Sequence, residues 1–185
     1  SIPNLVKLVF LFSPAPNPVV KKLAILLLAL APYFVFSQGQ VTNEINWISL
    51  EKAKKYAKKY DKNIFVYFHK KDCPYCEEMK RETLSDQTVI DLINHNFFPV
   101  KIDSRTKDTI YYNNKVFGNQ QPESSGRHDW RHDFYAEVAR FNRNGEDLTT
   151  TPTVVLFNSK FEKIKVLPGK QAKPLLLRNI KAYIK

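Results

Sequence analysis

The only two cysteines of the chain stand three positions apart, in the tetrapeptide Cys73-Pro74-Tyr75-Cys76. An apolar, β-like run at residues 64–68 precedes them, and a helix-like stretch follows. A thiol at a helix N-terminus faces unpaired backbone N–H groups and the positive end of the helix dipole, and both favour the reactive thiolate. The second thiol, one turn later, can close a disulfide and release whatever the first has bound. The spacing therefore predicts thiol–disulfide exchange.

A purely structural disulfide is not expected, because closing so short a loop removes little entropy from the unfolded chain. A metal site stays open as an alternative, since zinc takes four ligands in a tetrahedron and His69 lies close to the cysteines in sequence. A second candidate set lies on an expected helix, where side chains four apart share a face. It comprises His128, Asp129, His132 and Asp133. The competing interpretation is an exposed polar helix face, with Trp130 and Phe134 packed inward.

Length and composition predict a single packed domain, because the chain has 185 residues, of which 43% are hydrophobic and 13% aromatic. A net charge of +11 raises the question of nucleic-acid binding. Six lysines, however, fall within residues 52–62, where Ala53 and Ala57 mark the apolar face of an expected helix. A solvated lysine face explains this excess. Nucleic acid is therefore not expected as a partner, whereas an acidic partner surface stays open.

Residues 1–37 have the pattern of a secretory signal, because Lys21 and Lys22 precede an apolar run at 23–31 and the small residue Ser37 follows. The run is too short to span a membrane comfortably. We expect cleavage near Ser37 and export, to the bacterial periplasm; if retained, the segment would act as a membrane anchor. Cleavage removes three lysines and no acidic residue, which lowers the net charge to +8. Outside the cytoplasm disulfides persist, which suits a redox-active pair.

Residues 38–185 are then expected to form the folded domain. Hydrophobic periodicity, capping residues and turn residues divide it into alternating helices and strands. The expected elements are helix 49–60, strand 63–69, helix 74–84, helix 86–93, strand 96–103, a polar insert at about 104–150 with a helix at 129–143, strand 153–158, strand 162–167 and helix 172–184.

This order of elements resembles the thioredoxin fold over residues 47–185, and specifically the exported thioredoxin-like proteins. The motifs that carry the resemblance are a strand ending at Phe68, the CPYC tetrapeptide at a helix start, and Thr151-Pro152 just before a strand. The resemblance implies an α/β fold, in which a central mixed sheet is flanked by helices. The long, partly helical insert then precedes the strand that follows Pro152.

The resemblance also implies roles for individual residues. Cys73 is expected to be the more exposed, attacking thiol and Cys76 the resolving thiol. Pro152 is expected to be a cis-proline that packs against the disulfide, a form that is uncommon among X-Pro bonds. The backbone of Thr151 would pair with an extended substrate segment. Pro74 and Tyr75 are the remaining expected substrate-binding residues.

One position departs from the family pattern. Thioredoxins carry a buried acid six residues before the first cysteine, and here that position is Tyr67. The usual proton acceptor for Cys76 is therefore missing, and Glu77, Glu78 and water are the candidates to replace it. Lysines in the approach to the motif, at positions 70 and 71, favour acidic partners.

The sequence thus predicts an exported thiol–disulfide oxidoreductase that acts on protein thiols or disulfides. It needs no organic cofactor, because a membrane or periplasmic redox partner protein supplies or accepts the electrons. The direction of electron flow stays open, although the Pro74-Tyr75 linker indicates an intermediate reduction potential. The alternatives are a copper- or zinc-handling protein that uses the same cysteines, and a non-enzymatic module that binds a partner through its insert.

Overall fold

The computed structural model describes residues 43–122, 124 and 130–184. The expected signal segment at 1–37 and its cleavage site lie outside the described residues, and so do His128 and Asp129. Within the described part of the chain, no helix combines the length and apolar character needed to cross a bilayer.

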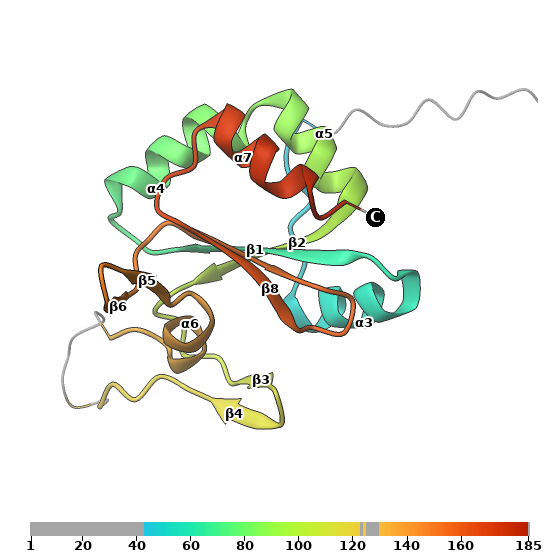
Figure 1. Cartoon of the computed structure of the whole chain (residues 1–185). Coiled ribbons are helices and arrows are strands. Elements are labelled where there is room, and N and C mark those ends of the chain that lie inside the picture. The colour runs from blue at the N-terminus through green and yellow to red at the C-terminus, as the bar shows by residue number, and fades with distance from the viewer. Residues whose placement is uncertain (1–42, 123, 125–129, 185) are drawn as a thin grey trace, which may run out of the picture. The chain divides into compact units, whose positions relative to one another are not determined.

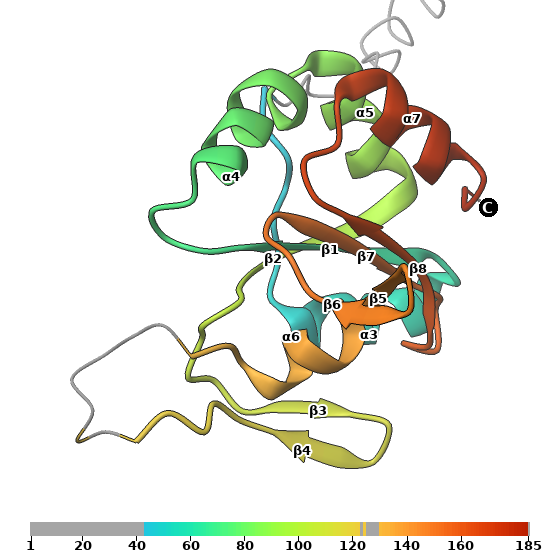
Figure 2. The same ribbon diagram turned by 60° about the vertical axis from the view of Figure 1, so that its left-hand side comes forward.

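A four-stranded sheet lies at the centre, with the strand order β2-β1-β7-β8. Strand β2 runs parallel to β1, whereas β7 is antiparallel to both of its neighbours, so the sheet is mixed, as predicted. Figure 1 and Figure 2 show α4, α5 and α7 on one face of the sheet and α3 and α6 on the other. The sheet strands are β1 (Asn63–His69), β2 (Phe97–Asp103), β7 (Thr153–Phe157) and β8 (Lys163–Pro168).

Strand β1 forms the middle of the molecule and is buried on both faces over its first six residues. Its aromatic and β-branched side chains alternate between the two sides, as the pleat of a strand requires. Phe65 and Tyr67 join the core beneath α4, α5 and α7. Phe68 joins the core shared with α3 and α6. This alternation determines which side chains near the end of β1 face α4, the helix that begins after Cys73.

Local capping signals start the helices at the predicted positions. Helix α3 (Leu50–Tyr60) begins after Ser49, whose side chain accepts a hydrogen bond from the backbone N–H of Lys52 at 3.3 Å. Helix α5 (Gln87–Asn96) begins after Asp86, whose carboxylate accepts from the N–H groups of Thr88 and Val89. The C-terminal helix is α7 (Lys173–Lys181).

The expected helix at 74–84 is present in two parts. Helix α4 (Pro74–Met79) continues into η2 (Lys80–Leu84), a π-helical turn. The Lys80 N–H already bonds the carbonyls of both Cys76 and Glu77. This wider turn begins four residues after Cys76. Single π-helical turns within α-helices are often found at functional sites.

The prediction of one helix over 129–143 is wrong. The helix α6 comprises only Asp133–Val138, and the chain then folds into a hairpin of β5 (Phe141–Arg143) and β6 (Glu146–Leu148). The pair Asn144-Gly145 takes positive φ angles of 55° and 88°, which Asn-Gly turns accommodate readily. A second hairpin in the insert is formed by β3 (Ile110–Tyr112) and β4 (Lys115–Phe117).

The insert is packed onto the sheet through aromatic side chains. Phe134 and Tyr135 of α6 lie against Phe68 of β1, with ring centroids 6.0 and 5.2 Å apart. Tyr112 of β3 meets the edge of the Phe134 ring at 5.5 Å. Trp130, which was expected to pack inward, is instead 46% exposed. The described part of the insert therefore packs into the core that β1 shares with α3 and α6.

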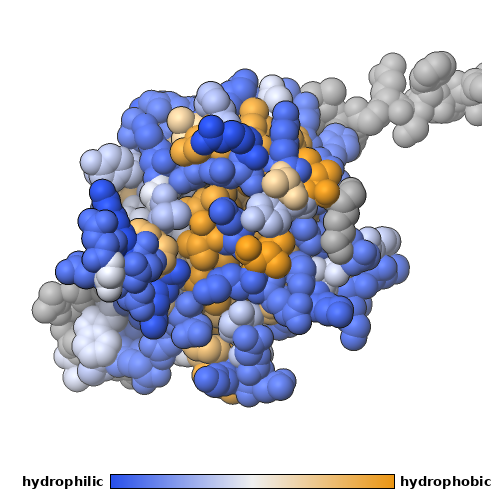
Figure 3. Space-filling view, viewed as in Figure 1, coloured by the Kyte–Doolittle hydropathy of each residue, from blue (hydrophilic) through white to orange (hydrophobic). Residues whose placement is uncertain are grey.

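Strand β8 forms one edge of the sheet, next to β7, and β2 forms the other. In β8, exposed Lys163 and Lys165 alternate with half-buried Ile164 and Val166. Charged side chains on an edge strand discourage pairing with another chain. Figure 3, viewed from the side of β8, shows apolar surface at the centre of this face surrounded by hydrophilic side chains.

Candidate active site

The register of the sheet brings the two predicted motifs together. Strands β1 and β7 are antiparallel, and Phe68 near the end of β1 pairs with Thr153 at the start of β7. The loop after β1 leads to Cys73, and the loop before β7 contains Thr151 and Pro152. The Thr151-Pro152 peptide bond is cis, as predicted. Two segments about 80 residues apart in sequence therefore meet at one end of the sheet.

Cys73 is the N-cap residue of α4 and forms a disulfide with Cys76. The Cα atoms of the pair are 5.2 Å apart, within the usual range for a disulfide. The backbone N–H of Cys76 donates to the Sγ of Cys73 at 3.2 Å. Once the disulfide is reduced, the same N–H is placed to stabilise a thiolate at Cys73.

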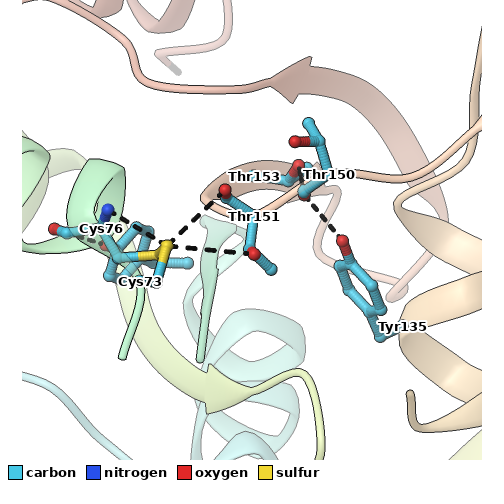
Figure 4. The surroundings of a disulfide bond; sticks show 7 residues. Cys73, Cys76, Tyr135, Thr150, Thr151 and Thr153 are labelled. Carbon is cyan, nitrogen blue, oxygen red and sulfur yellow. Dashed lines mark hydrogen bonds between the residues drawn. A yellow bond between two sulfur atoms is a disulfide. The ribbon is translucent and has the colours of Figure 1, made fainter. Parts of the chain in front are cut away.

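The sulfur of Cys73 faces Thr151, as Figure 4 shows. Its Sγ lies 3.7 Å from the Thr151 carbonyl oxygen and 4.0 Å from the Thr151 Oγ1. In the disulfide these are contacts; in the reduced protein the Cys73 thiol has two acceptors within reach. Thr151 is half-buried and Pro152 is buried. Among the other expected substrate-binding residues, Pro74 is exposed and Tyr75 is 64% exposed.

The expectation that Cys73 is the more exposed cysteine does not match the structure, because both cysteines are 3% exposed. The two sulfur-bearing residues differ instead in their neighbours. Cys73 contacts Thr151, while Cys76 lines a cavity between β1, α4 and the segment before α3. The surface next to Cys73 includes the exposed side chain of Tyr75.

Tyr135 of the insert holds the segment that faces Cys73. Its hydroxyl donates a hydrogen bond of 2.7 Å to the carbonyl oxygen of Thr150. The Thr153 hydroxyl donates to the same oxygen at 2.5 Å. Two donors thus fix the peptide unit immediately before Thr151, as Figure 4 shows. Sequence reasoning missed Tyr135, because no local motif marks it.

The cavity beside Cys76 has a volume of about 170 Å³. Tyr67 and His69 line it from β1, and Glu77 lines it from α4. The Tyr67 hydroxyl donates to the Cys76 carbonyl oxygen at 3.3 Å. Burial, with a smaller contribution from the Glu77 charge, raises the pKa of Tyr67 to about 12. Tyr67 therefore acts at neutral pH as a hydrogen-bond donor.

The metal alternatives find no support in the described residues. Across 43–122 and 130–184, no three His, Cys, Asp or Glu side chains gather in a way that could hold a metal ion. His132 is neither a free ligand nor part of an exposed face, because it is 1% exposed. Its Nε2–H donates to the carbonyl of Asp108 at 2.8 Å, and its Nδ1 accepts from the Phe134 N–H at 3.1 Å.

Comparison with known proteins agrees with this fold. The thioredoxin-like domain family matches residues 50–183. An uncharacterised protein of Archaeoglobus fulgidus is 30% identical over 87 residues, which cover 47% of this chain and 67% of the relative. The solved structure of a DsbH oxidoreductase has a TM-score of 0.52 at 15% identity, covering 79% of this chain and 88% of the other. A thioredoxin from Thermus thermophilus has a TM-score of 0.51 at 20% identity, with coverage of 77% and 88%.

The chain belongs to the thioredoxin-like family. Its mixed sheet, its cis-proline before β7 and its cysteine pair at the start of α4 all stand where this fold places them. Family and site together support a redox protein that works through thiol–disulfide chemistry.

Proposed function

We propose that this protein is a thiol–disulfide oxidoreductase that exchanges disulfides with exported proteins. The observation that carries the proposal is the position of the Cys73–Cys76 disulfide. The disulfide lies at the N-terminus of α4, and its Cys73 sulfur faces Thr151, next to the cis-proline.

In the reductive direction, the Cys73 thiolate attacks one sulfur of a substrate disulfide. A mixed disulfide forms, and the other substrate sulfur leaves as a thiolate. Cys76 then attacks the Cys73 sulfur, which closes the Cys73–Cys76 disulfide and releases the second substrate thiolate. The substrate gains two electrons and the protein loses two. The oxidative direction is the reverse sequence.

The segment around Thr151 provides a place for the substrate chain. Thr150 is fixed by two hydrogen bonds, so the Thr151 backbone beside Cys73 is held in one orientation. An extended substrate segment can pair with this backbone as an added strand. The exposed Tyr75 ring, two residues after Cys73, offers apolar contact area.

Export to the bacterial periplasm is part of the proposal. It is supported by the basic and apolar pattern within residues 1–37. There the electrons would pass to or from a periplasmic or membrane redox protein. Fusing residues 1–37 to a reporter enzyme that is active only after export tests this point. Activity of the fusion is expected, and a reporter that stays inactive would contradict export.

The exchange reaction is tested by trapping its intermediate. The Cys76→Ser variant keeps the attacking thiol and lacks the resolving one, so it should accumulate mixed disulfides with substrate proteins. Diagonal gels, run without and then with reductant, reveal these adducts. The matched Cys73→Ser variant should form none. Equal adduct formation by both variants would contradict the assignment of Cys73 as the attacking thiol.

The same two cysteine variants distinguish the exchange reaction from the two alternative functions. A metal-handling protein would carry stoichiometric copper or zinc after purification under reducing conditions, and both single variants would lose it. A non-enzymatic partner-binding module would keep its biological effect in the Cys73→Ser variant. The proposed exchange reaction requires loss of that effect.

A further inference from the structure

Cys76 must lose a proton before it can attack the mixed disulfide, because the thiolate is the nucleophile. A proton acceptor for Cys76 is needed only if the exchange reaction proposed above takes place. The acceptor must lie within reach of Cys76, directly or through water. The cavity of about 170 Å³ that Cys76 lines far exceeds the ~10–15 Å³ needed for one water molecule. The acceptor should therefore be among the side chains that line this cavity.

Tyr67 is excluded as the acceptor. It occupies the position at which thioredoxins carry a buried acid, and it contacts Cys76 through its hydroxyl. Its pKa of about 12 keeps the hydroxyl protonated at neutral pH. A protonated phenol that already donates to the Cys76 carbonyl is a poor base.

His69 stands two residues further along β1 and therefore on the same face of the sheet. Its ring stacks on Tyr67, with centroids 5.9 Å apart and an angle of 19° between the planes. It lines the same cavity as Cys76. The strand thus places an imidazole at the cavity where the family's acid is missing.

The surroundings of His69 favour its neutral form. Burial lowers the pKa of His69, and the Lys101 ammonium lowers it further. The carboxylates of Asp103 and Glu77, and a hydrogen bond from the His69 ring to the backbone of Lys70, act in the opposite direction and are weaker. A neutral imidazole can accept a proton at neutral pH. The remaining charged residues that line the cavity are Glu44 and Lys80.

The two acidic residues next to Cys76 are less suitable. Glu78 forms an ion pair with Lys170, in the loop after β8, and does not line the cavity. Glu77 does line the cavity, but it is exposed to solvent. A solvated carboxylate is a weaker base than an imidazole.

We infer that His69 is the proton acceptor for the resolving thiol Cys76. In the mixed disulfide, the Cys76 thiol passes its proton across the cavity to the neutral imidazole. The Cys76 thiolate attacks the Cys73 sulfur, and the bond between Cys73 and the substrate sulfur breaks. The electron pair leaves with the substrate thiolate, and the imidazolium returns its proton to solvent. In the oxidative direction His69 protonates Cys76 as it leaves.

Stopped-flow reaction of the reduced full-length protein with a chromogenic aromatic disulfide separates the two steps. Attack by Cys73 releases the first coloured thiolate at a rate that depends on reagent concentration. Attack by Cys76 releases the second at a rate that does not. The His69→Gln variant should keep the first rate and lose about tenfold or more in the second, because general bases typically contribute about 10²–10⁴-fold. Exposed His95, which does not line this cavity, supplies the matched control His95→Gln.

Two further readouts distinguish proton transfer from a structural effect. The wild-type second rate should fall as the pH drops through the His69 pKa. In His69→Gln this inflection should be absent, and the rate should follow only the ionisation of the Cys76 thiol. Added imidazole should restore the second rate of His69→Ala and leave the wild type unchanged. The unchanged first rate shows that each variant is folded.

A wild-type second rate in His69→Gln at every pH would overturn the assignment. So would a loss confined to Glu77→Gln, which would make Glu77 the acceptor. If the wild type shows no second phase at all, the exchange reaction itself fails, and His69 has no step to assist. The failure of the proposed function is thereby distinguished from the failure of the His69 assignment.

Discussion

The hydroxyl of Tyr135 donates a 2.7 Å hydrogen bond to the carbonyl oxygen of Thr150, so the insert directly supports the segment that faces the Cys73 sulfur. Tyr135 is buried against Phe68 at the end of β1. One side chain therefore contacts both the segment before β7 and the strand β1 that leads to Cys73. The insert is therefore part of the scaffold of the candidate active site.

Replacing Tyr135 by Phe should weaken this support without opening a cavity. Loss of the hydroxyl should lower the free energy of unfolding by about 1 kcal/mol, the usual contribution of a hydrogen bond. It should also slow attack by Cys73 on a disulfide substrate, because Thr150 then keeps only the Thr153 donor. Denaturant unfolding and the exchange rate measure the two effects.

The matched control is Tyr112→Phe, which removes a hydroxyl from the same aromatic cluster and leaves both donors to the Thr150 carbonyl in place. It should leave the exchange rate unchanged. If both variants exchange at the wild-type rate, Tyr135 has a packing role only.

Acidification should destabilise the protein through His132. Burial lowers the pKa of His132, despite opposing contributions from Asp108 and Asp133. The unfolded chain therefore binds a proton more readily than the folded one. The stability that neutral His132 contributes is fully present above about pH 6.5 and is lost as the pH falls through the folded-state pKa. Protonation also removes the Nδ1 acceptor that caps α6.

Urea unfolding between about pH 7.5 and 5 measures this effect. The His132→Asn variant keeps a side chain able to cap the helix and should show a shallower fall in unfolding free energy. A residual slope of the same sign is expected from His69, whose pKa is also lowered. An unchanged slope in His132→Asn would contradict the role of His132.

Truncating Phe134 to Ala should destabilise the whole domain rather than the insert alone. Its ring is fully buried and stacks with Phe157 of β7 at 6.2 Å. Removal of a buried Phe side chain typically lowers the free energy of unfolding by about 3–5 kcal/mol. Truncation of the exposed Trp130 should change it by under about 1 kcal/mol. Equal, small effects of both changes would show that the insert folds apart from the core.

Much of the site was predictable because its signals are local. The motif at 73–76 and the dipeptide Thr151-Pro152 stand in the printed sequence beside recognisable strands, and Ser49 and Asp86 mark helix starts. The misassigned helix followed from Phe134, Val138 and Phe141, whose spacing fits a helical face. The Asn144-Gly145 pair, a strong hairpin signal, was the sign that α6 must end before it.

The residues that sequence reasoning missed enter the site through long-range packing. Tyr135 reaches Thr150 only because α6 packs against Phe68. The burial of Cys73 involves its contact with Thr151, 78 residues further along the chain, which no local pattern encodes. His69 could have been found by strand alternation, since it shares a face with Tyr67, the position of the missing acid.

The most direct test of the central claim is the equilibrium between the Cys73–Cys76 disulfide and the dithiol in glutathione or dithiothreitol buffers, using metal-free protein. The account predicts a reversible two-electron reaction with a potential between about −270 and −120 mV, the range spanned by thioredoxin and DsbA. A value near or below about −220 mV would indicate a reductase, and one well above about −180 mV an oxidant or isomerase. A pair that forms no reversible disulfide, or one that resists reduction below about −300 mV as structural disulfides do, would contradict the account.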